Sequence, residues 1–180
     1  LAALMRPAAA AVTDVLAQTE DDAGRLREAG APRVALSGNL KFDVRPSPAL
    51  LARGRKWHQA LRRPVVLAAI TREGEEAELM REWGRAPGGN PFLIVVPRHP
   101  QRFDEVEALL VQHGLRVARR SAWGDMPSGQ ALQADAWLGD SLGEMPQYYA
   151  SSDVALLGGS FMALGGHNLI EAAACGCPIV

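Results

Sequence analysis

Four short segments of this sequence carry side chains that could bind an anion or a nucleotide, and each follows a short apolar run. The first is Pro97-Arg98-His99-Pro100, which comes after Phe92–Val96. The guanidinium fork of Arg98 can donate paired hydrogen bonds to a phosphate or a carboxylate, and the prolines stiffen the turn. Arg98 could instead pair with Glu105 or Glu107 on the following segment. We interpret this segment as an anion-binding loop, with His99 as a secondary candidate.

The second segment is rich in glycine and ends at Glu171. Its Gly158-Gly159-Ser160 and Gly165-Gly166-His167 stretches would let the backbone approach a ligand closely, although His167 could simply be a turn histidine. Asn168 is placed to cap a helix whose positive dipole end would face a pocket. Glu171 could complete a capping box or accept hydrogen bonds from a ribose diol. The combination favours a nucleotide site.

The other two segments give weaker signals. Gly139–Glu144 precedes an expected helix, whose first N–H groups could hold an anion or a base edge. Asp140 and Ser141 in this segment could equally be plain capping residues. Lys41, within Asn39–Asp43, could neutralise a substrate anion, and a solvated lysine is the alternative.

The elements that must position these segments alternate along the chain. Short apolar runs, typical of strands covered on both faces, are separated by longer helical patterns, and this order predicts an α/β fold with a Rossmann-like, doubly wound parallel sheet. In such a sheet, ligands bind at the carboxyl ends of the strands, where the candidate segments lie. We expect strands at 15–17, 33–36, 65–69, 92–96, 115–118, 136–138 and 154–157, and helices at about 20–29, 48–61, 74–83, 101–112, 144–150 and 168–175.

The composition narrows the classes of function. Of the 180 residues, 48% are apolar and 22% charged, which excludes a disordered tail. The formal net charge of −1 gives no electrostatic case for nucleic acid as a partner. No apolar run approaches the roughly 20 residues that would span a bilayer. The 18 glycines and 12 prolines indicate many tight turns.

The ends and the middle of the chain indicate its organisation. The proline-rich stretch Val44–Pro48 is the best candidate for a domain boundary. The chain opens on Leu1, and Pro178–Val180 are typical of the first residues of another buried strand, so we expect a fragment of a longer protein. Cys175 and Cys177, one residue apart, are poorly placed for a disulfide and lack the further ligands of a zinc site. We expect two reduced, semi-buried thiols.

Several motifs are missing. The sequence has no G-x-x-x-x-G-K-[ST], and no G-x-G-x-x-G follows a strand, which argues against P-loop nucleotidases and dinucleotide dehydrogenases. Neither H-E-x-x-H nor G-x-S-x-G is present, which removes zincins and the usual α/β-hydrolases. The acidic residues from Glu73 to Glu78 are expected on a solvated helix face, and no carboxylate cluster suggests a tightly bound divalent metal.

Taken together, the motifs resemble those of bacterial 3-deoxy-D-manno-oct-2-ulosonic acid (Kdo) transferases. The resemblance extends over nearly the whole chain from about Val15, in family order and at family-like spacing. The motifs that carry it are Gly38-Asn39-Leu40-Lys41-Phe42-Asp43, Thr71-Arg72-Glu73-Gly74-Glu75-Glu76, Pro97-Arg98-His99-Pro100, Gly143-Glu144, Gly158-Gly159-Ser160 and Gly165-Gly166-His167-Asn168.

The resemblance implies the two-domain GT-B glycosyltransferase fold. Residues 1–46 would end an acceptor-binding N-terminal domain, and residues 47–180 would form most of the C-terminal domain that binds the donor CMP-Kdo. The reaction implied is metal-independent transfer of Kdo, with CMP leaving. Lys41 matches the lysine thought to stabilise charge in the transition state. The implied CMP contacts are Pro97, Arg98, Leu142, Gly143, Glu144, Asn168, Leu169, Ile170 and Glu171.

The sequence departs from the family pattern at three positions. Ile70 replaces the usual serine before Thr71, Leu142 replaces a methionine, with Ser141 before it in place of threonine, and Leu169 replaces a proline. No residue here matches the family's general-base carboxylate, which lies in the N-terminal domain with the membrane-anchoring segment.

The resemblance therefore predicts a fragment that holds the donor site but cannot catalyse transfer alone. The acceptor implied for the full-length protein is the lipid A precursor (lipid IVA), and the place is the cytoplasmic face of the bacterial inner membrane, with the fragment itself soluble. Two alternatives stay open: another GT-B enzyme that uses a UDP-sugar, and a non-catalytic nucleotide-binding α/β module.

Overall fold

The computed structural model describes residues 2–84, 91–160 and 168–180. The chain divides into two compact units, Leu1–Val44 and Arg45–Val180. The division falls within the proline-rich stretch Val44–Pro48, where prolines and a non-helical Ser47 separate two elements. Each unit is described by itself below.

The smaller unit contains a two-stranded parallel sheet. β1 (Val15–Ala17) pairs with β2 (Val34–Leu36), and helix α2 (Glu20–Glu28) connects them. Thr19 caps α2, because its side chain accepts a hydrogen bond from the backbone N–H of Asp22 at 3.1 Å. Helix α1 (Ala2–Ala10), which the sequence analysis did not predict, precedes the sheet, and the 3₁₀ helix η1 (Leu40–Asp43) follows it.

The larger unit is built on a five-stranded parallel sheet, as predicted. The strands are β3 (Val65–Thr71), β4 (Phe92–Pro97), β5 (Val117–Arg119), β6 (Ala136–Leu138) and β7 (Val154–Leu157), in the spatial order β5-β6-β4-β3-β7. Its helices are α3 (Pro48–Leu61), α4 (Glu75–Trp83), α5 (Phe103–Gln112), α6 (Gly129–Leu132), α7 (Met145–Ala150) and α8 (Ile170–Ala174), with short 3₁₀ turns η2 (Pro100–Arg102) and η3 (Arg120–Ala122).

Most predicted elements differ from the observed bounds by one or two residues at an end; β3, for example, continues to Thr71. The strand predicted at 115–118 begins only at Val117, because the N–H of Leu115 still donates to Leu110 at the end of α5. Gly114, at φ +83°, reverses the chain there. The helix predicted at 168–175 is shorter and spans Ile170–Ala174. At the end of the chain, Ile179 forms a parallel bridge with Ala155 of β7.

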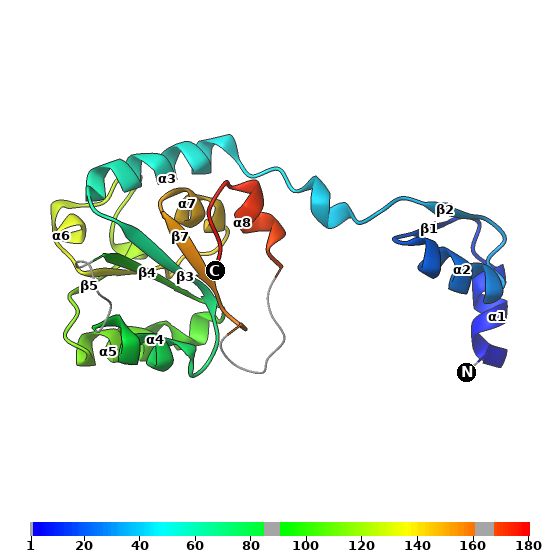
Figure 1. Ribbon diagram of the computed structural model, residues 1–180, viewed down its shortest axis with the longest axis horizontal. Coiled ribbons are helices and arrows are strands. Elements are labelled where there is room, and N and C mark those ends of the chain that lie inside the picture. Colours follow the sequence, from blue (N-terminus) through cyan, green and yellow to red (C-terminus); the bar gives the residue numbers. More distant parts are fainter. Residues whose placement is uncertain (1, 85–90, 161–167) are drawn as a thin grey trace. The chain divides into compact units, whose positions relative to one another are not determined.

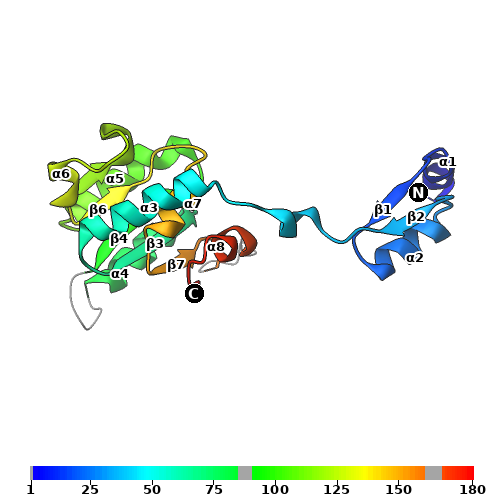
Figure 2. The same ribbon diagram turned by 90° about the horizontal axis from the view of Figure 1, so that it is seen from above.

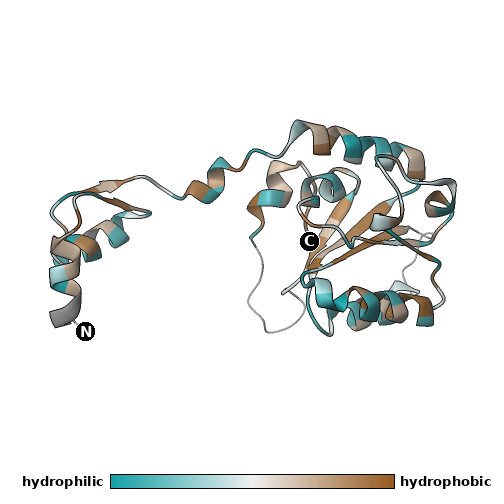
Figure 3. Ribbon diagram, turned by 180° about the vertical axis from the view of Figure 1, so that it is seen from behind, coloured by the Kyte–Doolittle hydropathy of each residue, from teal (hydrophilic) through white to brown (hydrophobic). Residues whose placement is uncertain are grey.

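Helices cover both faces of the sheet, as Figure 1 shows. On one face, α3 and α7 pack over strand residues such as Leu67 and Ile94. On the other, α4 and α5 pack over the alternate residues, such as Ala68 and Val95. The strands are accordingly mostly apolar, as the brown arrows of Figure 3 show. This double cover confirms the predicted doubly wound architecture.

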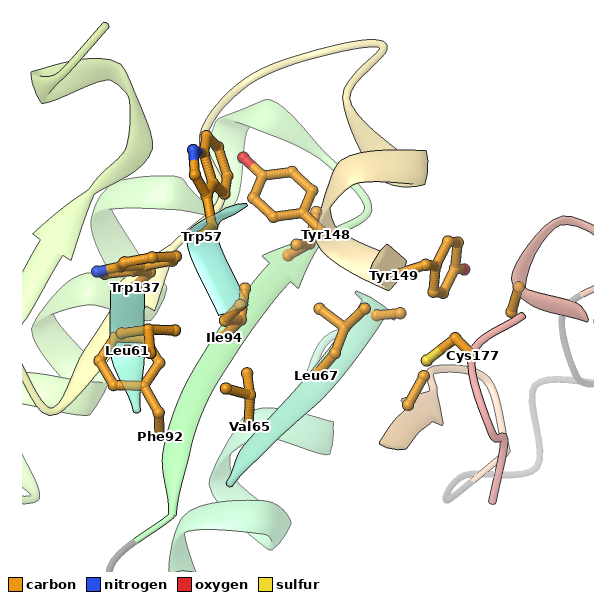
Figure 4. Packing of buried hydrophobic residues seen from close by; sticks show 14 of the residues in the cluster. Trp57, Leu61, Val65, Leu67, Phe92, Ile94, Trp137, Tyr148, Tyr149 and Cys177 are labelled. Carbon is orange, nitrogen blue, oxygen red and sulfur yellow. The ribbon is translucent and has the colours of Figure 1, made fainter. Parts of the chain in front are cut away.

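The first face holds an aromatic cluster centred on Trp57 of α3 (Figure 4). Trp57 meets Trp123, Trp137 and Tyr148 edge-on, with ring centroids 5.6–6.2 Å apart. Its indole N–H donates to the Asp125 carbonyl at 2.8 Å. Trp137 and Tyr148 also form hydrogen bonds, to the Ala131 carbonyl and the Ser141 hydroxyl, whereas the buried Trp123 indole nitrogen has no partner among the described residues. Such rings bury large apolar areas, so the cluster fixes α3 and α7 on the sheet.

The strand order places a topological switch point between β3 and β7. From β3 the chain moves to β4 on one side, and it later returns to β7 on the other side of β3. All pairings are parallel, so the carboxyl ends of the strands share one edge. Open α/β sheets bind ligands outside such an edge. The fold therefore singles out the segments that follow β3, β4, β6 and β7.

Helices α3 and α7 lie side by side in both views of the ribbon (Figures 1 and 2), and Gly54 makes their close approach possible. A Cβ atom at Gly54 would lie 2.3 Å from the Gln147 carbonyl oxygen. We therefore expect Gly54→Ala to lower the free energy of unfolding by about 3 kcal/mol, because the two helices must move apart.

The matched control is Gly129→Ala in α6, where an added Cβ would meet nothing within 4 Å. This variant should leave the free energy unchanged or raise it by up to about 1 kcal/mol. Urea unfolding of both variants measures the difference, and equal effects would contradict the described crossing of α3 and α7.

Candidate nucleotide site

Backbone hydrogen bonds fasten the candidate segments to the carboxyl edge of the sheet. The N–H of Arg98 donates to the Thr71 carbonyl at 3.0 Å, and the N–H of Gly158 donates to Ala69 at 2.8 Å. On the other side of β4, Gly139 donates to Val95 at 2.8 Å. The segments after β4, β6 and β7 thus start from fixed positions along one edge.

The end of β3 is bent and closely packed. Its pairing register with β4 shifts between Ala69 and Thr71, and Ile70 has a φ of +57°. A left-handed conformation is costly for a β-branched residue, by about 1–2 kcal/mol. Gly158 of the next segment comes so near that a Cβ atom there would lie 2.3 Å from the Ile70 carbonyl oxygen. Only glycine fits at this crossing of β3 and β7.

Glu75 and Glu76, at the start of α4, are buried, which corrects the prediction of a solvated acidic face. Glu75 is 2% exposed and accepts hydrogen bonds from the N–H groups of Gly159 at 2.7 Å and Arg72 at 2.8 Å. Gly74, at φ +90°, starts the helix directly at the sheet edge. The carboxylates therefore face the neighbouring segments rather than the solvent.

Glu76 fastens the segment after β4. It is 1% exposed and accepts a hydrogen bond from the Thr71 hydroxyl at 2.6 Å. Its carboxylate also accepts hydrogen bonds from both terminal nitrogens of Arg102, at 2.9 and 3.0 Å. Burial alone would lower the pKa of the Arg102 guanidinium, but hydrogen bonds to Glu76 and Glu105 outweigh this cost and raise its pKa. Arg102 closes the loop that begins with Pro97 and Arg98.

The predicted anion-binding loop presents its polar groups outward. Pro97 is buried at the end of β4, whereas Arg98 and His99 are exposed. Of the two carboxylates considered as alternative partners of Arg98, Glu105 accepts a hydrogen bond from Arg102 and Glu107 accepts one from Arg119.

The segment after β6 is held by side chains rather than by helix capping. Asp140 accepts the N–H of Ser121 at 2.8 Å and its hydroxyl at 2.6 Å, and Ser141 shares a 2.6 Å hydrogen bond with the Tyr148 hydroxyl. The alternative that these residues cap α7 is therefore wrong, since Glu144 occupies the N-cap position without a side-chain cap. Leu142 and Gly143, at φ +75°, stay exposed.

The side chain of Glu144 belongs to an ion-pair network. Arg120 is 8% exposed, and its Nη2 donates to Glu144 at 3.0 Å. Its guanidinium carbon lies 5.0 Å from the centroid of Trp57 and 5.7 Å from that of Trp123. Arg53 lies 3.6 Å from the same carboxylate. A contact from Glu144 to a nucleotide would therefore come from its backbone.

The start of α8 carries the last predicted contacts. The Asn168 side chain accepts a hydrogen bond from the backbone N–H of Ile170 at 3.0 Å. It thereby satisfies one of the first N–H groups of α8, which have no partner within the helix, although the N-cap position itself is Leu169. Leu169 is exposed, and burial raises the pKa of the half-buried Glu171. Gly159 is bound to Glu75, and Ser160 is exposed. Gly165, Gly166 and His167 lie outside the described residues.

Lys41 belongs to the smaller unit. It is exposed in η1, where its N–H donates to the Asn39 side chain at 3.0 Å.

Sequence reasoning missed the charges that hold the loops, namely Glu75, Glu76, Arg102 and Arg120. A signal for the first two was their position directly after a strand and Gly74. For Arg120, the partners Trp57 and Glu144 are distant in sequence, so local pattern does not reveal that the guanidinium is buried.

Three further features belong to the described part of the chain. It contains no group of three or more His, Cys, Asp or Glu side chains arranged to hold a metal ion. None of its helices has the length and apolarity needed to cross a bilayer. Both Cys175 and Cys177 are free thiols, and burial raises the pKa of each to about 11.

The chain is similar to known proteins along its whole length. Residues 1–44 match the family model described as 3-deoxy-D-manno-octulosonic-acid transferase (kdotransferase). The 3-deoxy-D-manno-octulosonic acid transferase of Bordetella pertussis is 49% identical over 98% of this chain and 42% of its own length. That of Haemophilus influenzae is 33% identical over 92% of this chain and 39% of its own. The chain thus spans about two-fifths of these relatives.

A solved structure matches the larger part of the chain. It is the crystal structure of the C-terminal CMP-Kdo binding domain of WaaA from Acinetobacter baumannii, with a TM-score of 0.61 and 34% identity. The match covers 74% of this chain and 70% of that one.

The Arg120–Glu144 pair generates a prediction about stability. Replacing Arg120 with methionine leaves the Glu144 carboxylate in a half-buried site without its main partner, so we expect a loss of about 3–5 kcal/mol of unfolding free energy. Arg81→Met is the control, because Arg81 pairs with Glu78 on the exposed face of α4. It should cost less than about 1 kcal/mol. Similar losses in urea unfolding would refute a structural role for Arg120.

Proposed function

The chain belongs to the 3-deoxy-D-manno-octulosonic acid (Kdo) transferase family, and we propose that its Arg45–Val180 unit binds the donor CMP-Kdo. The observation that carries the proposal is the likeness of this unit to a solved CMP-Kdo binding domain at 34% identity. The alignment of the candidate segments along one carboxyl edge supports it independently, because nucleotides bind parallel sheets there.

We assign the parts of CMP to the segments by their chemistry. Arg98, exposed at the end of β4, would pair with the phosphate, with Pro97 and His99 beside it. Leu142, Gly143 and the backbone of Glu144 would meet the base, because Leu142 and Gly143 are exposed at the turn before α7 and the Glu144 side chain is held by Arg120. Asn168 and the first turn of α8, through Glu171, would hold the ribose. Gly159 and Ser160 are secondary contacts in this arrangement.

The chemistry proposed for the whole protein is transfer of Kdo from CMP. As the bond between the sugar and CMP breaks, negative charge grows on the leaving phosphate. A fixed guanidinium at Arg98 and helix N–H dipoles would stabilise that charge more in the transition state than in the bound substrate. For the whole protein we propose that Lys41 stabilises charge in the transition state, and that the reaction needs no metal ion.

The acceptor and the cellular place are proposals for the longer protein. We propose the lipid A precursor as acceptor and the cytoplasmic face of the inner membrane as the place of reaction. Since the chain spans about two-fifths of its relatives, we infer that these 180 residues bind the donor without transferring it. The general base would be supplied from the remainder.

Calorimetric titration with CMP tests the donor site. We expect saturable binding to the 180-residue chain and a loss of about 30-fold or more in affinity for Arg98→Ala, because a charge-assisted pair to phosphate is removed. Arg55→Ala is the control: Arg55 is an exposed cation on α3, outside the candidate segments, and its loss should leave the affinity unchanged.

UMP and UDP separate the possible nucleotides in the same titration. Both should bind more weakly than CMP, since the base edge differs. Tighter binding of UDP would replace the proposal with a UDP-sugar enzyme. If CMP binds equally well to the wild type and to Arg98→Ala, the site is placed wrongly.

Glu171 gives a prediction about pH. Burial raises the pKa of its carboxyl, so Glu171 becomes protonated at a higher pH than an exposed glutamate. Only the carboxylate accepts strong hydrogen bonds from ribose hydroxyls. The ratio of CMP affinities between wild type and Glu171→Gln should therefore fall toward one as the pH is lowered from about 8 to about 5. Taking the ratio cancels protonation of CMP itself. A ratio constant with pH would remove Glu171 from the ribose contact.

A further inference from the structure

A side chain from another element holds the start of the loop that follows β7. Gly159 donates its N–H to Oε1 of Glu75 at 2.7 Å, across 84 positions of the sequence. The second oxygen, Oε2, accepts the N–H of Arg72 at 2.8 Å. One carboxylate therefore joins the turn after β3 to the loop after β7.

The turn after β3 is also fastened to the loop after β4. Arg98 donates its N–H to the Thr71 carbonyl at 3.0 Å, next to the Arg72 amide that Glu75 holds. The connection runs from the Arg98 loop through Thr71 and Arg72 to Glu75, and from Glu75 to Gly159. Its two ends are segments to which the proposed function gives contacts with the donor.

The surroundings of Glu75 leave the β7 loop little freedom. Gly158 lies so close to β3 that a Cβ atom would be 2.3 Å from the Ile70 carbonyl oxygen and 2.8 Å from Oε2 of Glu75. Glu75 itself is 2% exposed. A carboxylate is buried at a large cost in solvation, and N–H donors aimed at both oxygens offset it. If the hydrogen bond from Gly159 or from Arg72 to Glu75 is lost, we therefore expect the loop itself to change position.

We infer that Glu75 is a positioning residue for the donor site. It holds the Gly158–Ser160 loop at a fixed separation from the Arg98 loop, so that both face the same nucleotide. This inference rests on the proposed function for its consequence, CMP affinity. The fastening of Gly159 itself can be measured without any nucleotide.

The experiment compares Glu75→Gln with Glu78→Gln in the 180-residue chain. Both variants remove one negative charge from α4, but Glu78 is an exposed residue that pairs with Arg81. Glutamine at position 75 keeps one acceptor oxygen and presents an amide N–H₂ to the other donor, so one of the two bonds is lost. Circular dichroism establishes a temperature at which all three proteins are folded, and all measurements are made there.

Two readouts are expected to change together in Glu75→Gln. The Gly159 amide should exchange its hydrogen faster, and the affinity for CMP should fall about tenfold, because the competent arrangement of the loop becomes a minor population. Glu78→Gln should match the wild type in both. Wild-type affinity and exchange in folded Glu75→Gln would overturn the inference, as would an equal loss of affinity in both variants.

A measurement on the wild type covers the case in which Glu75→Gln does not fold. Addition of CMP should then slow exchange of the Gly159 amide, because the loop is held against the bound nucleotide, and unchanged exchange would overturn the inference. If the wild type binds no CMP, the proposed function fails. Exchange at Gly159 in Glu75→Gln then still decides whether the carboxylate fastens the loop.

Discussion

The crossing of β3 and β7 is the constraint on which the rest of the carboxyl edge depends. Ile70 takes a left-handed conformation at the end of β3, Gly158 fills the space above its carbonyl, and the buried Glu75 carboxylate closes the gap by accepting N–H groups from both sides. The strain at Ile70 is tolerated because the neighbouring bonds fix the backbone there. Loops held at a fixed separation suit a nucleotide site. The binding groups need no reorganisation when the ligand arrives, so less free energy is spent on ordering them.

The opposite side of the edge is set by a different interaction. The guanidinium of Arg120 is enclosed by Trp57 and Trp123 and pairs with Glu144, which begins α7. The aromatic cluster that covers one face of the sheet thereby also holds the Leu142–Glu144 turn. Glu76 and Arg102 do the same for the loop after β4. Packing and electrostatics are thus coupled: the apolar layers position the buried charges, and the charges position the exposed loops.

Local pattern was enough for most of the fold and for the edge of the sheet at which the candidate segments lie. The runs 15–17, 136–138 and 154–157 and the helix 48–61 are found at their predicted bounds, because each is a sharply bounded apolar or amphipathic segment. The charges behaved differently. The sequence pattern predicted that Glu75 and Glu76 lie on a solvated helix face. Helical periodicity does not reveal that Gly159, after β7, and Arg102 bind these two carboxylates. Capping of a helix was one of two alternatives for Asp140, but its carboxylate instead accepts hydrogen bonds from Ser121 in η3, the turn after β5.

The central claim is that the segments after β4 and β6 and at the start of α8 form one CMP site. Mapping of backbone amide shifts by NMR during addition of CMP tests this most directly. We expect the amide signals of Arg98, Gly143 and Ile170 to shift together along one saturation curve. The amide signal of Arg62, at the amino-terminal edge of the sheet beside β3, should keep its chemical shift. Shifts confined to one of the three segments, or centred on the amino-terminal edge, would contradict it.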